Sequence, residues 1–129
     1  MPERSQVLVT NTTPLIALTA ATGSLDVLRF LYTRVVVPQP FLRNSLDRGE
    51  AAAIQTALNL SLPLVCIDET AGRRIARLCA LNVTGTVGVL LKAQGMGYAL
   101  NIPDALQRMR DHGIWLSGQV VKFALSHGY

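Results

Sequence analysis

Four polar side chains stand where short apolar runs of this sequence stop: Asn11, Asp68, Thr84 and Thr86. A further acid, Glu50, opens an alanine-rich stretch. In an open parallel sheet, ligands bind outside the carboxyl ends of the strands. The spacing therefore predicts that these side chains converge on one cleft and supply it with carboxylate, amide and hydroxyl oxygens. Only two of the positions carry a carboxylate, which limits the charge available there.

Both acids also have a purely structural explanation. Asp68 is placed to cap a helix that begins near Thr70, and it can cap that helix and serve the cleft at once. Glu50 stands three residues after Asp47, which is the spacing of a capping box. The sequence leaves the structural and the functional interpretations open for both acids.

The amide and the hydroxyls have structural explanations too. Asn11 precedes Thr-Thr-Pro, so it fits an Asx turn or a helix cap as well as a ligand position. Thr84 and Thr86 flank a glycine in a tight strand-to-helix turn, where threonines commonly serve as turn and cap residues. These interpretations also remain open.

Three arginines follow Asp68 closely: Arg73, Arg74 and Arg77. Arg73 and Arg77 are four residues apart and therefore share one face of a helix. They form either an ordinary solvated face or a strip that contacts phosphates without reading sequence. Base stacking is not a visible theme, because aromatic residues are few and most lie in core-like patterns. Trp115 is predicted to anchor the core, and His112 and His127 are predicted to lie at helix ends.

The elements that position these residues alternate along the chain. Strands are predicted at residues 7–10, 34–37, 64–67 and 82–84. Helices are predicted at about 14–23, 24–31, 48–60, 70–81, 87–93, 103–112 and 117–127. Such alternation implies a parallel sheet with right-handed crossovers and helices on both faces. The predicted fold class is α/β, and residues 1–129 are predicted to form a single domain.

Two of these helices carry more detailed predictions. A threonine cap followed by Pro14 at the first helical position fits the start of the first helix. In the helix at 70–81, Ile75, Leu78 and Cys79 are predicted to face inward, with the three arginines on the other face.

The composition excludes some classes of function. No apolar stretch approaches the roughly 20 residues that a membrane span requires, and no signal-peptide pattern opens the chain. We therefore expect a cytoplasmic protein without a membrane partner. Cys66 and Cys79 lack the paired spacing of metal ligands and are predicted to be buried, reduced thiols. The net charge of +4 favours polyanionic partners, although this excess is modest for a nucleic-acid binder.

Four blocks of the sequence resemble a branch of the PIN-domain proteins that is usually described as predicted nucleic-acid-binding proteins. The blocks are Thr10–Leu18, Leu46–Ala51, Ile67–Arg74 and Val83–Leu91. They occur in the family order and, with what joins them, span nearly the whole chain. The last two blocks are the most specific. The resemblance implies a three-layer α/β/α sandwich with a small parallel sheet.

Many PIN domains are metal-dependent ribonucleases, and many bacterial members are the toxin of a toxin–antitoxin pair. Carried over residue by residue, the acidic positions of the family fall on Asn11, Glu50, Asp68 and either Thr84 or Thr86. The resemblance implies Mg²⁺ or Mn²⁺ as the cofactor, RNA as the substrate, and an antitoxin protein and a second copy of the chain as partners.

The resemblance assigns a role to each candidate residue. The expected catalytic residues are Glu50, Asp68 and Asn11, and the first two are the expected metal ligands, because Mg²⁺ typically takes one or two carboxylates and keeps several waters. A metal held there would activate a water and stabilise the phosphoryl oxygens. The supporting residues are Thr84, Thr86 and Glu69, and the residues expected to contact nucleic acid are Arg73, Arg74 and Arg77.

Two departures from the family pattern matter. Asn11 stands where active PIN nucleases usually have Asp, so an oxygen is kept but one negative charge is removed. The segment near residues 38–47 is short or incomplete, and family members often carry dimer and antitoxin contacts there. The leading expectation is a PIN-type RNA endonuclease that acts as a toxin. The alternative is a PIN-like module that has lost catalysis and binds RNA or a protein partner.

Overall fold

Four short strands pair into one parallel sheet. They are β1 (Val7–Thr10), β2 (Arg34–Val36), β3 (Leu64–Cys66) and β4 (Asn82–Thr84). The spatial order is β2-β1-β3-β4, and Val9 pairs with Val36 on one side and with Val65 on the other. The structure, a computed structural model, describes residues 6–38 and 48–128. Each strand lies within the range that the apolar runs predict.

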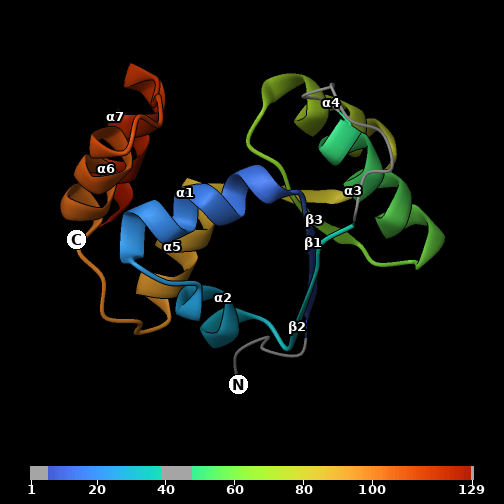
Figure 1. Ribbon diagram of the computed structural model, residues 1–129, viewed down its shortest axis with the longest axis horizontal. Coiled ribbons are helices and arrows are strands. Elements are labelled where there is room, and N and C mark those ends of the chain that lie inside the picture. The colour runs from blue at the N-terminus through green and yellow to red at the C-terminus, as the bar shows by residue number, and fades with distance from the viewer. Residues whose placement is uncertain (1–5, 39–47, 129) are drawn as a thin grey trace.

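Helices cover both faces of this sheet. Within the described residues they are α1 (Thr12–Thr22), α2 (Asp26–Leu31), α3 (Arg48–Asn59), α4 (Thr70–Leu78), α5 (Thr86–Gly95), α6 (Ile102–Asp111) and α7 (Gly118–His127). Figure 1 shows α3 and α4 on one side of the sheet and the other five helices on the opposite side. The prediction of an α/β fold with a small parallel sheet between two helical layers is confirmed.

Each face of the sheet has its own core, because successive side chains of a strand point to opposite faces. Leu8 and Cys66 belong to the larger core, which includes residues of α1, α2, α5, α6 and α7. Val9, Val65 and Ile67 belong to a smaller core with residues of α3 and α4. All three residues of β3 are buried, as its continuous apolar run predicts.

α4 is shorter than predicted and presents a different face to the core. It ends at Leu78, and Ala80 beyond it has a positive φ of 63°. Its buried residues are Gly72 and Ala76, whereas Ile75 is 51% exposed and Leu78 is 80% exposed. The prediction that Ile75 and Leu78 face inward is therefore wrong. Two small residues four positions apart share one helix face and let that face approach its neighbours closely.

The start of α1 also differs from the prediction. Asn11 occupies the N-cap position, Thr12 is the first helical residue and Pro14 is the third. The predicted threonine cap with Pro14 at the first position is therefore wrong by two residues. Pro14 still lies in the first turn, where its missing N–H has no intrahelical partner to lose. The helix ends as predicted at Gly23, a left-handed C-cap with a φ of 88°.

Three further side chains show where local patterns succeed or fail. Trp115 is 82% exposed, so the prediction that it anchors the core is wrong. His112 is the C-cap residue of α6 and His127 is the last residue of α7, as predicted. Both cysteines are free thiols, with Cys66 buried as predicted and Cys79 only half-buried.

Some predictions fall on parts that the structure does not describe. The segment 39–47, which the sequence predicts to be short, lies outside the described residues, and so does the predicted cap Asp47. The assignment of residues 1–129 to one domain stays a prediction. Within the described ranges, no helix is long and apolar enough to cross a membrane.

Candidate functional site

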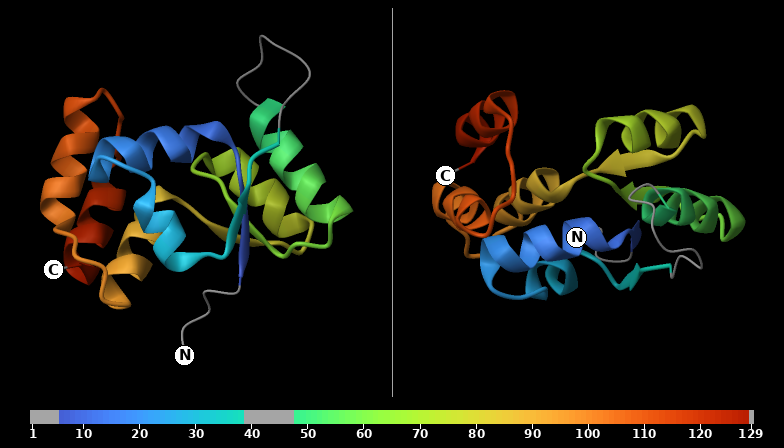
Figure 2. Two further views of the ribbon diagram at one scale, coloured as in Figure 1. Left: turned by 60° about the horizontal axis from the view of Figure 1, so that its bottom comes forward. Right: turned by 45° about the horizontal axis from the view of Figure 1, so that its top comes forward.

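The carboxyl edge of the sheet is where the connections change sides. β1 leads into α1 on one face, whereas its neighbour β3 leads into α4 on the other face (Figure 2). Adjacent strands whose chains leave in opposite directions open a crevice at their carboxyl ends, and ligands of open α/β sheets bind there. Asn11 follows β1 and Asp68 closely follows β3, so both residues stand at this point.

The Asn11 side chain is buried, and no donor from the described residues reaches its Oδ1 atom. Asn11 is only 6% exposed, and its backbone takes the N-cap conformation of α1. Its side chain nevertheless makes no capping hydrogen bond, and Oδ1 has no partner among the described residues. The interpretation of the Asn11 side chain as a helix cap is therefore wrong. A buried acceptor without a donor costs about 1–3 kcal/mol, so this oxygen requires an explanation.

Glu50 is the buried acid of the site. It lies in the first turn of α3 and is 6% exposed. Its carboxylate rests against Gly72 of α4, where an added Cβ would lie 2.8 Å from Glu50 Oε1 and 3.0 Å from Ile67 Cγ2. The preceding residue, Gly49, lies beside Asn11, because a Cβ there would be 3.4 Å from Asn11 Cβ. The N-terminal turn of α3 thus brings Glu50 to the carboxyl end of β1.

Asp68 is held by the start of a different helix from the one the sequence suggests. Its Oδ1 accepts a hydrogen bond from the Thr86 backbone N–H at 2.7 Å, and its Oδ2 accepts one from Thr86 Oγ1 at 2.7 Å. Asp68 therefore caps α5, whereas Glu69 holds the N-cap position of α4 without a side-chain capping bond. The expectation that Asp68 caps the helix beginning near Thr70 is wrong, although a capping role in itself is present.

The two threonines of the strand-to-helix turn have different surroundings. Thr86 is 2% exposed and binds Asp68, so it is the one that the fold brings to the acid. Thr84 Oγ1 lies 3.5 Å from the carbonyl oxygen of Gly85, and a Cβ at Gly88 would lie 2.8 Å from it. Thr84 thus faces the first turn of α5. Sequence reasoning named both residues but had no signal that pairs Thr86 with Asp68 across 18 positions.

The three arginines do not form one uniform strip. Arg73 is half-buried, and its Nη1 donates a hydrogen bond to the carbonyl oxygen of Ile67 at 3.1 Å. A Cβ at Gly85 would lie 2.7 Å from Arg73 Nη1 and 2.8 Å from Asp68 Oδ1, so cation and acid flank the same glycine. Arg74 and Arg77 are exposed. Of the three arginines, Arg73 is the one whose guanidinium lies at the glycine that borders Asp68.

The candidate residues Glu50, Asp68 and Asn11 carry oxygen donors, the chemical type that hard cations take. Among the described residues, no group of three or more His, Cys, Asp or Glu side chains is placed to hold a metal ion. Mg²⁺ commonly binds one or two carboxylates and retains water, so the donor types of two acids and the Asn11 amide oxygen, unpartnered within residues 6–38 and 48–128, are compatible with it. Burial, and after it the charge of Asp68, raise the pKa of the nearby Cys66 thiol to about 12. This thiol therefore stays protonated and is no thiolate ligand.

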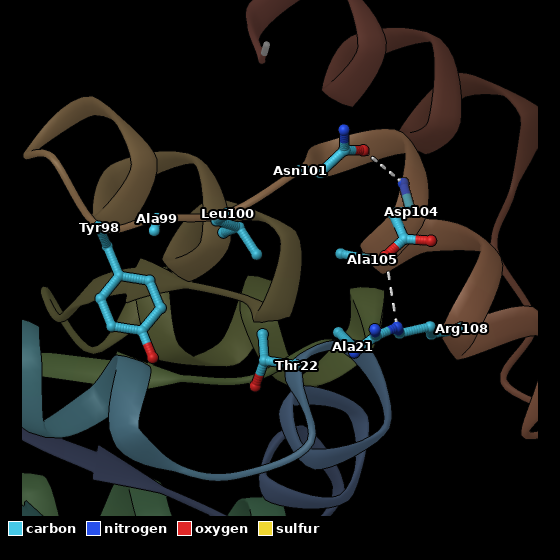
Figure 3. Close-up of a pocket in the computed structure, with 9 residues that line it drawn as sticks. All are labelled: Ala21, Thr22, Tyr98, Ala99, Leu100, Asn101, Asp104, Ala105 and Arg108. Atoms are coloured by element: carbon cyan, nitrogen blue, oxygen red, sulfur yellow. Dashed lines mark hydrogen bonds and ion pairs between the residues drawn. The ribbon is translucent and has the colours of Figure 1, made fainter.

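A second concavity lies between the end of α1 and the start of α6, and Figure 3 shows its lining. It has a volume of about 200 Å³. Its polar groups are engaged in helix contacts, because Asn101 Oδ1 accepts from the Asp104 backbone N–H at 2.8 Å and Asp104 pairs with Arg108 at 3.4 Å. None of the candidate residues lines this concavity.

Comparison with known proteins bears on the same residues. A family model described as a PIN domain matches residues 39–128, which is more than two thirds of the chain. The matched range includes Glu50, Asp68 and Thr86, whereas Asn11 precedes it. No curated protein and no solved structure matches the chain.

Proposed function

The chain belongs to the PIN-domain family, and from that premise we propose that it is a metal-dependent RNA endonuclease. The family has a nuclease-type fold, which supports cleavage of a phosphodiester bond. The observation that carries the proposal is the Asn11 Oδ1 atom, which is buried and lacks a donor among the described residues. It lies at the carboxyl edge of the sheet, where the acids Glu50 and Asp68 also stand.

In this proposal Glu50 and Asp68 hold Mg²⁺ or Mn²⁺, and Asn11 completes the catalytic set. When bound, such an ion supplies an activated water and stabilises charge on the phosphoryl oxygens. Thr86 keeps both oxygens of Asp68 in one orientation through its N–H and hydroxyl. Glu50 is kept away from bulk water between α3 and α4. Thr84 and Glu69 are supporting residues near these acids.

The arginines of α4 are proposed to bind the RNA backbone. Arg73 is oriented by its hydrogen bond to the Ile67 carbonyl, and its guanidinium lies at the glycine that also borders Asp68. A guanidinium fixed in this way suits a bidentate phosphate contact. Arg74 and Arg77 are exposed and contribute charge that attracts the polyanion without reading sequence.

The partners and the location follow from the family expectation. We propose a cytoplasmic toxin-type component that pairs with an antitoxin protein and with a second copy of itself. Exposed apolar residues at the C-terminal ends of α3 and α4 support an apolar interface: Leu58, Leu60, Ile75 and Leu78.

A second function competes with the first. The chain would then be a PIN module that binds RNA without cutting it. Asn11 favours this alternative because it contributes no charge to the site, and Asp68 favours it because Thr86 already engages both of its oxygens. Neither observation explains the buried Asn11 Oδ1, which has no donor among the described residues, and this atom favours the nuclease over the binding module.

The deciding experiment is Mn²⁺-dependent cleavage of an RNA with structured and single-stranded parts, with and without a chelator. Wild type is compared with Asp68→Asn and with Asp111→Asn, an exposed acid at the end of α6. The nuclease predicts cleavage that is lost with chelator and in Asp68→Asn but kept in Asp111→Asn. Absence of cleavage by carefully purified wild type, together with RNA binding, would establish the binding module instead.

A further inference from the structure

The turn between α6 and α7 presents the only tryptophan of the chain to solvent. Trp115 is 82% exposed, although tryptophan has the largest apolar side chain that folding can bury. The residues on either side of it, Ile114 and Leu116, are half-buried and pack against the larger core. The indole between these two anchored residues is therefore left on the solvent side of the turn.

The turn is held by its own hydrogen bonds. The Ile114 N–H donates to the Met109 carbonyl at 3.0 Å, and the Val120 N–H donates to Ser117 Oγ at 3.1 Å. Both ends of the turn are thereby tied to the adjoining helices. A ring presented by a fixed turn loses little conformational freedom when a ligand settles on it.

A cationic side chain lines the same surface depression as the ring. Arg110 and Trp115 line the same open depression, which has a volume of about 460 Å³. Arg110 is exposed, and its guanidinium has no hydrogen-bond or ion-pair partner within the part of the chain that the structure describes. The neighbouring Arg108 differs, because Asp104 pairs with it at 3.4 Å. The adjacent acid Asp111 accepts a hydrogen bond from Gln107 at 2.9 Å.

We propose that Trp115 and Arg110 form a contact site for single-stranded RNA. One base stacks on the indole face, and the guanidinium of Arg110 binds a phosphate of the same strand. Stacking on an exposed aromatic ring beside a cation is how proteins bind single strands without reading their sequence. The choice of RNA as the polymer rests on the proposed function, whereas the site itself is separate from Glu50 and Asp68.

This site lies in the turn between α6 and α7 and shares no lining residue with the candidate acids. In Figure 1 the turn between α6 and α7 is in the upper half of the view, as are the starts of α3 and α4. In this proposal the site binds one part of an RNA strand, and another part of the same strand reaches the carboxyl edge of the sheet. Its loss weakens RNA binding and leaves the chemistry of the bond intact.

The single tryptophan makes the proposal directly measurable. Uridine-rich RNA of about 12 nucleotides, within the usual range of site sizes, is titrated into the protein in the presence of chelator so that no cleavage occurs. We expect a saturable change in Trp115 fluorescence that weakens as salt is raised. The same RNA carrying a fluorescent label reports total binding through its anisotropy.

Substitutions distinguish stacking on the indole from nonspecific apolar or electrostatic binding. Trp115→Leu keeps an apolar side chain without an aromatic face and is expected to weaken RNA binding about 5- to 150-fold, whereas Trp115→Phe should retain much of it. Arg110→Gln should weaken binding and lower the salt dependence by about one counterion. The matched controls are Leu125→Ala and Arg29→Gln, at exposed positions on α7 and α2, and both should bind as wild type does.

Several outcomes would overturn the proposal. One is RNA binding, seen by anisotropy, that leaves Trp115 fluorescence unchanged, and another is equal affinity of wild type and Trp115→Leu. A fluorescence change that depends on protein concentration alone, with a matching increase in sedimentation, would assign the turn to contact with a second copy of the chain. A different outcome separates the two proposals. If wild type binds RNA in the presence of chelator but does not cleave it when Mn²⁺ is supplied, the nuclease is refuted and the Trp115 site is retained.

Discussion

At the scale of single residues, the oxygens of the candidate site differ in their hydrogen-bond partners. Both carboxylate oxygens of Asp68 are held by Thr86, whereas Asn11 Oδ1 is buried without a donor among the described residues. An amide oxygen can serve a cation, but it adds no charge. The affinity for a divalent ion is therefore limited by the number of acids rather than by the number of oxygens.

We predict that Asn11→Asp tightens Mn²⁺ binding. The substitution adds a negative charge at a buried position, and attraction over about 4 Å amounts to several kcal/mol even at the effective dielectric constant of proteins. Titration calorimetry should therefore show an affinity at least about tenfold higher. Asn82→Asp, at the exposed first residue of β4, is the matched control and should change nothing. Equal affinities of wild type and Asn11→Asp would exclude Asn11 from the metal site.

Cys66 makes stability depend on alkaline pH. Burial, and then the charge of Asp68, raise the pKa of this thiol from 9.0 to about 12. Between those values the native state keeps a proton that the unfolded chain has lost, so stability is complete below about pH 9 and falls as the pH rises towards 12. Burial likewise raises the pKa of Tyr32 from 10.0 to about 12, which acts in the same direction.

The measurement is the urea midpoint at neutral pH and at about pH 10.5. We expect the urea midpoint of wild type to be lower at the alkaline pH than at neutral pH. The midpoint of Cys66→Ala should decrease by less, whatever its stability at neutral pH. Cys79→Ala, at the half-buried cysteine, is the control and should fall as wild type does. Identical falls in all three proteins would rule out Cys66 as the source.

At the scale of elements, the approach of α4 to α3 depends on Gly72. An alanine there would place its Cβ 2.8 Å from Glu50 Oε1 and 3.0 Å from Ile67 Cγ2. We predict that Gly72→Ala lowers the free energy of unfolding by about 1–3 kcal/mol through overpacking, against a gain of up to about 1 kcal/mol in helix propensity. It should also weaken Mn²⁺ binding, because Glu50 must move.

Gly95→Ala provides the comparison. This glycine ends α5 and has open space where a Cβ would stand, so alanine should be neutral or stabilising by up to about 1 kcal/mol. Urea unfolding and Mn²⁺ titration of both variants test the two effects separately. If Gly72→Ala behaves as Gly95→Ala does, the close contact between α3 and α4 does not constrain the site.

At the scale of the whole molecule, the apolar ends of α3 and α4 support self-association. Leu78 is 80% exposed and Ile75 is 51% exposed on α4, and Leu60, just beyond the end of α3, is 52% exposed. We predict that wild type sediments as a dimer and Leu78→Lys as a monomer with unchanged Mn²⁺ affinity. Ile16→Lys, at an apolar residue of α1 that is 60% exposed, is the control and should leave the dimer intact. A monomeric wild type would remove this interface.

Much of the fold follows from local patterns. The four apolar runs became four parallel strands, because a run such as Leu64–Cys66 is satisfied only between two helical layers. The alternation of strands and helices then permits few topologies. The last helix is predicted to begin at Ser117, and there the Ser117 hydroxyl accepts from the Val120 N–H at the N-cap of α7. The predicted caps at the starts of α1 and α4 are wrong.

The sequence patterns gave wrong predictions where an apolar side chain could lie either in the core or at the surface. Ile75 and Leu78 are apolar but exposed, because Gly72 and Ala76 permit the closer contact and so decide which face of α4 is buried. Trp115 is exposed because Ile114 and Leu116 on either side of it reach the core. Hydrophobicity ranks the side chains, but shape and spacing select among them.

The sequence by itself determined the parallel sheet, its helical layers and the polar residues at the carboxyl edge, because strand and helix periods and end signals are local. Only the tertiary structure decided which contact each polar residue makes. It joined Asp68 to Thr86, placed Glu50 over Gly72 and left Asn11 Oδ1 buried without a donor among the described residues. Such contacts join residues far apart in the chain, and their geometry depends on how closely the layers pack.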